Sequence, residues 1–215
     1  MPIEPRDFDT LYAAGTRYAE PGNGYRILLQ EDRGWLSLPT GRVVAAEPAV
    51  LGADTDRYAF AQTVPPGRYP VVLTIAEYRQ SPAPDADVVD ERVAAARLVI
   101  RDEPVTGWEM ALPPGRHAEA LGDDEFYGYP VDGGTGCFVD PGSTPLLDDD
   151  EEMRDLSMDI ADRPTSVTVL EGPDGEPILA AFTTGWGDGS YPTWVGRSAS
   201  GEIACFLTDF GILEV

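Results

Sequence analysis

The chain contains no lysine and a single histidine, His117, so all 15 of its basic residues are arginine. Several kinds of site depend on the missing side chains: the P-loop, the Schiff-base lysine, the Ser-Lys pair, and zinc or iron sites that use two histidines. The composition therefore excludes these classes of site.

Cysteine is also scarce. Cys137 and Cys205 are too few for a disulfide scaffold or a four-thiolate zinc site. Both stand among apolar neighbours, so we expect buried and inert thiols. A nucleophilic pair of Cys137 and His117 stays open as an alternative, although nothing in the sequence around them indicates it.

Long apolar runs are absent. No segment approaches the roughly 18 residues that a membrane-spanning helix needs, and residues 1–9 carry Glu4, Asp7 and Asp9 instead of a basic start and an apolar run. We therefore expect a soluble, cytoplasmic protein that does not contact membranes.

The charge of the chain is strongly one-sided. It has 38 acidic residues and a formal net charge of −23, which repels nucleic-acid phosphates and anionic membranes. Nucleic acid is therefore not an expected partner. An acidic surface serves solubility, and it also favours the binding of cations or of a basic protein partner.

Strand-length apolar and β-branched runs recur along the chain, separated by glycine and proline. They span residues 25–29, 35–38, 42–46, 69–78, 93–100, 167–170, 178–183 and 203–207. With 215 residues and 42% hydrophobic content, the chain can bury one sizeable core. The pattern predicts a single domain over residues 1–215, of a β-rich α+β class with a mostly antiparallel, sandwich-like sheet.

Two hairpins are indicated by their turns. Residues 171–176 predict a turn between two strands, and residues 81–90 predict a mobile loop between the long strands 69–78 and 91–100. In the second long strand, alternate residues form two faces. One face is expected to pack on the core and consists of Ala94, Ala96, Leu98 and Ile100.

The main helix is predicted over residues 145–161 and is expected to pack against the sheet. Four apolar residues fall on one stripe of this segment: Leu146, Met153, Leu156 and Ile160. Pro145 suits the first helical position, and the acidic run 148–152 suits the positive end of the helix dipole. We interpret that run as a solvated face, with a cation or basic-partner site as the alternative. A shorter helix is predicted over residues 7–13.

Glycine is densest in two segments, residues 131–142 and 185–194. Such density indicates tight turns or the close approach of another group to the main chain. We expect both loops at one end of the sheet, where they form a ligand-binding surface. Its expected members are Asp132, Gly133, Gly134, Thr135, Gly136, Asp140, Trp186, Gly187, Asp188, Gly189, Ser190, Tyr191 and Trp194.

Three interpretations of this surface stay open. Asp132, Asp140 and Asp188 supply the hard oxygen ligands that calcium or magnesium prefers, and a metal-bound water would then hydrolyse an ester or phosphoester. This requires the three carboxylates to converge within about 5 Å of one point. Aromatic faces beside carboxylates would also suit a sugar or a cationic ligand. Alternatively, the aspartates cap turns and the aromatic side chains fill the core.

In combination, the motifs of this chain resemble a bacterial family known only as a domain of unknown function. The resemblance runs through residues 38–48, 66–71, 92–98 and 108–112, and it ends on the motifs VDxGTGCFxD and GWGDGxYP and on residues 208–210. In that family the first block ordinarily ends Cys-Asp-Pro, whereas this chain has Ala46-Glu47-Pro48, so a scheme that uses that thiol does not apply here. The resemblance implies a shared fold and surface and no established activity.

Two classes of function remain. The charge, the lack of lysine and histidine chemistry, and the aromatic loops favour a non-catalytic acidic binding protein, such as an immunity or antitoxin partner of a basic protein. The alternative is a metal-assisted hydrolase that uses Asp132, Asp140 and Asp188.

Overall fold

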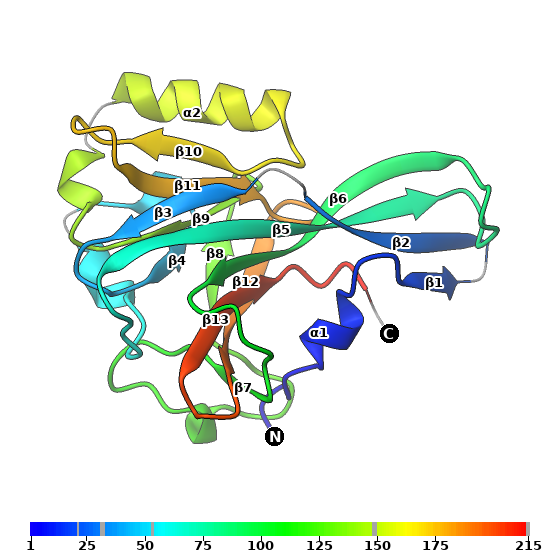
Figure 1. Cartoon of the computed structure of the whole chain (residues 1–215), viewed down its shortest axis with the longest axis horizontal. Coiled ribbons are helices and arrows are strands. Elements are labelled where there is room, and N and C mark those ends of the chain that lie inside the picture. The colour runs from blue at the N-terminus through cyan, green and yellow to red at the C-terminus, as the bar shows by residue number, and fades with distance from the viewer. Residues whose placement is uncertain (21, 31–32, 53, 148–149, 214–215) are drawn as a thin grey trace.

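The computed structural model describes residues 1–20, 22–30, 33–52, 54–147 and 150–213, and within them the strands form two antiparallel sheets (Figure 1). The large sheet has the order β1-β2-β5-β6-β13-β12-β7, with β3 paired to β5 and β8 paired to β12. Its strands are β1 Arg17–Glu20, β2 Asn23–Leu29, β3 Gly34–Leu38, β5 Gly67–Arg79, β6 Val88–Val99, β7 Gly107–Met110, β8 Gly128–Val131, β12 Gly189–Arg197 and β13 Ile203–Asp209.

The small sheet has the order β10-β11-β9-β4. Its strands are β4 Val44–Ala46, β9 Thr135–Val139, β10 Thr168–Glu171 and β11 Pro177–Thr183. The two α-helices are α1 Phe8–Leu11 and α2 Asp150–Asp162, and short 3₁₀ turns span Pro48–Val50, Thr55–Tyr58, Ala118–Ala120 and Thr144–Leu146. No helix in the described part of the chain is long and apolar enough to cross a membrane. The predicted β-rich α+β class with mostly antiparallel pairing is confirmed.

Buried side chains form three clusters, which pack the two sheets and the helices against one another. The main core lies between the two sheets and includes Leu73 of β5, Phe138 of β9 and Phe206 of β13. A second cluster covers the other face of the large sheet with α1 and the C-terminal segment, and a third packs α2 on the small sheet. The alternation of a strand assigns its residues to these layers: Phe138 faces the main core, while Cys137 on the same strand faces α2.

The predicted single apolar face of the second long strand is wrong, because the strand contains a bulge. Pairing between β5 and β6 shifts register between Thr74 and Ile75, whose partners are Ala95 and Val93. The extra residue, Ala94, reverses the alternation. As a result Val93 joins Ala96 and Leu98 in the main core, while Ala94 and Ala95 face α1.

The β5–β6 hairpin is longer than its turn residues suggest. Strand β6 begins at Val88, inside the segment predicted as a loop, and β5 reaches Arg79. With β2 and β1 alongside, the hairpin projects from the body of the molecule as an arm (Figure 1). The hairpin predicted at residues 171–176 is confirmed by the pairing of β10 with β11.

Helix α2 begins at Asp150, later than its prediction at residue 145. Pro145 lies in the 3₁₀ turn Thr144–Leu146, and Leu146 is exposed, so this part of the expected apolar stripe does not reach the core. Leu156 and Ile160 pack on the small sheet as expected, with Met153 beside them. Residues 148 and 149 of the acidic run lie outside the described residues. The predicted short helix is confirmed as α1, with Asp7 as its N-cap.

The chain crosses from the large sheet to the small one between β3 and β4, at residues 39–43. Gly41 has a φ of +71°, and a Cβ placed on it would lie 2.0 Å from the carbonyl oxygen of Val64. The crossover therefore needs glycine for two reasons, the left-handed backbone and the close approach of a second segment.

Replacing Gly41 by alanine should cost more stability than the same change at Gly175, which has a similar φ of +78° and nothing within 4 Å of its Cβ position. We expect Gly175→Ala to lower the free energy of unfolding by about 1 kcal/mol through backbone strain alone. Gly41→Ala should lose about 2 kcal/mol more, because a clash is added. Urea denaturation of both variants measures the difference, and equal losses would contradict the role assigned to the Val64 contact.

Candidate functional site

The two glycine loops lie side by side, as the sequence predicts. Strand β9 pairs with β11 up to Thr135 and Thr183, and the amide of Thr184 donates to the Gly134 carbonyl at 3.0 Å. A Cβ placed on Gly134 would be 3.6 Å from the Cα of Gly187, so the loops touch through their backbones.

Only part of the second segment is a loop. Residues 185–188 form the turn, and strand β12 begins at Gly189, so Ser190, Tyr191 and Trp194 stand on a strand of the large sheet. Tyr191 and Trp194 are buried, whereas Trp186 is 55% exposed and lies under the guanidinium of Arg92. The expected aromatic surface is therefore divided between the core and the solvent.

Asp140 is fully buried and serves as a structural anchor. Its carboxylate accepts hydrogen bonds from the Thr40 amide at 2.8 Å, the Thr40 hydroxyl at 2.8 Å and the Gly142 amide at 2.7 Å. These donors occupy the oxygen atoms that a metal ion would need. The carboxylate thus ties the turn after β9 to the crossover between the sheets.

Asp132 and Asp188 are exposed, and the structure does not bring them together with Asp140 as a metal site. Within the described ranges, no group of three or more histidine, cysteine, aspartate or glutamate side chains is placed to hold a metal ion. The physical reason is that the backbone and hydroxyl donors around Asp140 already satisfy the one buried carboxylate of the expected set.

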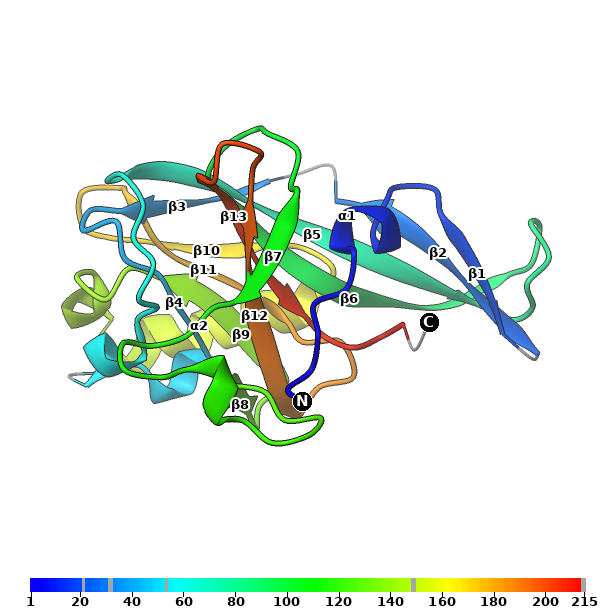
Figure 2. The ribbon, with the colours of Figure 1, turned by 90° about the horizontal axis from the view of Figure 1, so that it is seen from below.

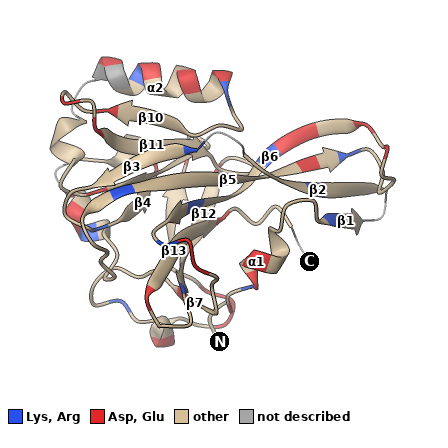
Figure 3. Ribbon diagram, viewed as in Figure 1, with Lys and Arg blue, Asp and Glu red and all other residues tan. Residues whose placement is uncertain are grey.

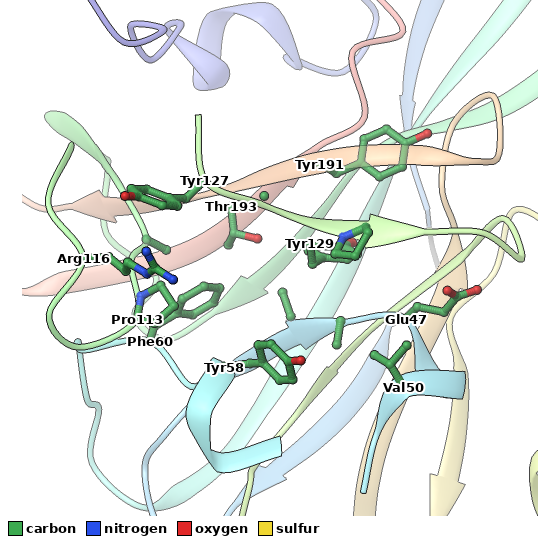
Figure 4. Close-up of a pocket in the computed structure, with 15 residues that line it drawn as sticks. Glu47, Val50, Tyr58, Phe60, Pro113, Arg116, Tyr127, Tyr129, Tyr191 and Thr193 are labelled. Carbon is green, nitrogen blue, oxygen red and sulfur yellow. The ribbon is translucent and has the colours of Figure 1, made fainter. Parts of the chain in front are cut away.

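A pocket of about 250 Å³ opens beside the glycine loops (Figure 4). Its floor comes from the end of β4 and from β8 and β12, and its mouth from the segments 48–52, 54–60 and 111–128. Figure 4 shows Arg116 and Tyr127 on one side and Glu47 and Val50 on the opposite side. The lining residues are Ala45, Ala46, Glu47, Val50, Tyr58, Phe60, Ala111, Pro113, Arg116, Tyr127, Gly128, Tyr129, Pro130, Tyr191 and Thr193.

The wall of this pocket is mostly apolar and aromatic, and its mouth leaves apolar side chains in contact with solvent. Val50 is 50% exposed and Tyr58 is 40% exposed. The guanidinium of Arg116 lies over the ring of Tyr127, 5.5 Å from its centroid. A concave apolar surface with a few polar groups at its edge is the form that ligand sites usually take.

Glu47 holds one wall of the pocket in place. Its side chain is buried, and its two carboxylate oxygens accept from the amides of Asp132 at 3.1 Å and Gly133 at 2.6 Å. In Figure 4 its carboxylate points away from the pocket, toward this loop. A Cβ on Gly133 would lie 2.7 Å from Glu47 Oε1, so glycine is needed for the contact.

Tyr129 forms the back of the pocket and reaches into the protein. Its hydroxyl is buried without a hydrogen-bond partner, and a Cβ placed on Gly136 would be 2.5 Å from it. Burial raises the pKa of Tyr129 well above its ordinary value, because the phenolate would lose its hydration, and the nearby Cys137 adds to the effect. Gly136 is therefore conformationally ordinary but required by the packing of this ring.

The open alternative of a Cys137–His117 nucleophile is not supported. Cys137 is fully buried on the α2 side of the small sheet, and burial raises the pKa of its thiol far above the ordinary value. His117 is exposed, in the loop before the 3₁₀ turn Ala118–Ala120. Cys205 is also buried, and burial raises its pKa to about 11. Both thiols are free and inert at neutral pH.

A family model described as protein of unknown function matches residues 36–208, which include the crossover, both glycine loops and all the residues that line the pocket. The chain belongs to the DUF4241 family. The predicted membership of an uncharacterised family is thereby confirmed. No similar curated protein and no similar solved structure was found. The DUF4241 match starts within β3 and ends at Thr208, so the N-terminal segment and α1 lie outside it.

Several pocket residues were not predicted from the sequence: Glu47, Tyr58, Arg116, Tyr127 and Tyr129. Glu47 carried one usable signal, because the resemblance places it at the acidic position of a Cys-Asp-Pro block. The others stand in loops without a motif, and only the fold brings them within reach of β12.

The anchoring role of Asp140 predicts a large effect of a small change. Asp140→Asn places an N–H group against backbone and hydroxyl donors, and it should lower the free energy of unfolding by about 2–4 kcal/mol. Asp132→Asn and Asp188→Asn, which are exposed, should stay within about 0.5 kcal/mol of wild type. Denaturation in EDTA and again in calcium should give the same ranking. Calcium stabilisation of wild type that all three variants lose would instead restore the metal site.

Tyr129 predicts a specific response to alkaline pH. The folded pKa is raised above the unfolded value of 10.0, so the stabilisation is complete below pH 10 and is lost as the pH rises above it. Tyr129→Phe should change stability little at neutral pH, because no hydrogen bond is lost. Above pH 10 its free energy of unfolding should fall less steeply than that of wild type, by about 1.4 kcal/mol per pH unit. Tyr58→Phe, at an exposed site, is the control, and identical slopes for all three proteins would contradict the prediction.

Proposed function

We propose that this DUF4241 protein is a non-catalytic binding protein of the immunity or antitoxin type, whose pocket receives an apolar side chain of a basic protein partner. The observation that carries the proposal is the pocket itself, an apolar hollow with exposed Val50 and Tyr58 at its mouth. Tyrosine and arginine around a desolvated pocket are the composition of interaction hot spots.

The charge of the molecule supports a basic partner. Acidic residues lie along α2, in α1 and toward the far end of the β5–β6 arm (Figure 3). With a net charge of −23, such a surface accelerates encounter with a positively charged protein and disfavours acidic ones. The apolar pocket would then supply the short-range affinity that screened surface charge does not.

The chemistry around the pocket supports binding more than catalysis. Glu47 is bound to backbone amides, Asp140 is bound to Thr40 and Gly142, and both thiols are buried. The alternative of a metal-assisted hydrolase gains no specific support, since Asp132 and Asp188 stand apart from the buried carboxylate. The proposal keeps the expected cytoplasmic location, where free thiols such as Cys137 and Cys205 are usual.

Selection of a random peptide library on the immobilised protein tests the proposal. Enriched peptides should share one aromatic or branched apolar residue flanked by lysine or arginine. Val50→Asp should weaken their binding about tenfold, because it places a charge in the pocket mouth, as measured by fluorescence anisotropy.

Val89→Asp is the matched control, since Val89 is 53% exposed on the arm and Val50 is 50% exposed. It adds the same charge away from the pocket and should change affinity less than about twofold. Raising the salt concentration should weaken wild-type binding. Enriched peptides that are acidic, or that bind Val50→Asp as well as Val89→Asp, would contradict the proposal.

A further inference from the structure

A second cavity, of about 440 Å³, lies between the N-terminal segment, the beginning of β12 and the end of β13. Figure 2 shows the N-terminal segment running from the end of β12 toward α1, close to the C-terminal segment. The Ile3 amide donates to the Glu125 carbonyl at 3.1 Å, and the Arg6 guanidinium donates to the Leu213 carbonyl, so both ends of the segment are fixed. The cavity is separate from the pocket at Tyr58, and Tyr191 lines both.

Asp209 lines this cavity and carries a buried charge that the chain compensates only with neutral donors. Its Oδ1 accepts from the Tyr12 hydroxyl at 2.5 Å and from the Gly211 amide at 3.0 Å. Among the described residues, its Oδ2 accepts no hydrogen bond and no arginine forms an ion pair with it. A buried carboxylate in this state gains strongly from a cation.

Trp194 supplies the complementary group. Its side chain is 2% exposed, and its indole N–H has no hydrogen-bond partner within the described structure. A buried indole N–H ordinarily donates to an acceptor, and leaving it unpaired is costly. The cavity is thus lined by Asp209, whose carboxylate lacks a cation, and by Trp194, whose buried indole N–H lacks an acceptor in the described structure.

The rim of the cavity is acidic. Glu4 and Asp124 are exposed and line it, so with Asp209 three carboxylates face the single guanidinium of Arg6. Part of that guanidinium is engaged by the Leu213 carbonyl. The field at the mouth therefore favours a second positive charge on the ligand.

We propose that this cavity binds a basic amino acid, either free or at the N-terminus of a peptide. The α-ammonium group pairs with Asp209, the neighbouring carbonyl or carboxylate oxygen accepts the N–H of Trp194, and the basic side chain extends toward Glu4 and Asp124. The inference is independent of the proposed protein partner, because the residues that carry it do not line the first pocket.

Isothermal titration calorimetry with four probes tests the three contacts separately. L-arginine and the tripeptide Arg-Gly-Gly both carry the α-ammonium group, the neighbouring oxygen and the basic side chain. The one that binds more tightly shows whether the ligand is a free amino acid or the N-terminus of a peptide. Agmatine lacks the acceptor for Trp194, and L-citrulline lacks the side-chain charge, so both should bind at least about tenfold more weakly. Absence of binding by both L-arginine and Arg-Gly-Gly would overturn the proposal.

Variants assign the binding to this cavity. Asp209→Asn should weaken L-arginine more than about tenfold, and Trp194→Phe should weaken L-arginine while leaving agmatine unchanged. The exposed pair Glu4→Gln/Asp124→Asn avoids any folding defect, since asparagine tolerates the φ of 60° at residue 124. It should weaken L-arginine about tenfold and leave L-citrulline unchanged.

Asp85→Asn/Glu91→Gln, on the exposed arm, removes the same two charges away from the cavity and should leave L-arginine binding unchanged. Equal effects of the two double variants would overturn the assignment. Val50→Asp should also bind L-arginine normally, so failure of the peptide-pocket proposal and failure of this one are distinguishable.

Discussion

The buried carboxylate of Asp140 is the contact on which the arrangement of the two sheets depends. It has no cation beside it in the described structure, and its charge is balanced by the Thr40 amide, the Thr40 hydroxyl and the Gly142 amide. Hydrogen bonds to a charged group contribute about 1.5–3 kcal/mol each, more than neutral ones. Because Thr40 lies where the chain leaves the large sheet, these bonds fix the angle at which β4 enters the small one.

The position of the pocket wall depends on this crossover. Once β4 is placed beside β9, Glu47 follows directly and reaches the amides of Asp132 and Gly133. That contact orients the first glycine loop, which joins β8 to β9. Strand β8 in turn pairs with β12. Asp140, which the sequence pattern offers as a metal ligand, and Glu47, which it does not, therefore both act as anchors, and the pocket is formed by the segments that they hold.

The sequence predicts local features of this fold well and long-range ones poorly. Helix α2 and the β10–β11 hairpin follow from periodicity and turn residues close together in the chain. Strand β12 was not predicted, because its glycines indicate a loop and two of its pairing partners, β7 and β8, come from distant segments of the chain. The adjacency of the glycine loops was predicted, and turn capping by Asp140, seen in its bond with the Gly142 amide, was one of the open alternatives. Its link to Thr40 was not predicted, since Thr40 lies 100 residues away.

Tyr191 is the wall between the two cavities, and its rigidity decides whether they act separately. Its hydroxyl donates to the Gly187 carbonyl at 2.7 Å, and its ring meets Phe210 edge to face at 5.1 Å. A side chain held at both its tip and its face loses little freedom when a ligand arrives, so neither site requires the wall to move. Coupling between sites needs an element with two arrangements, and this wall has one set of contacts that serves both. Both cavities are therefore open with Tyr191 in this one position, although they share the residue.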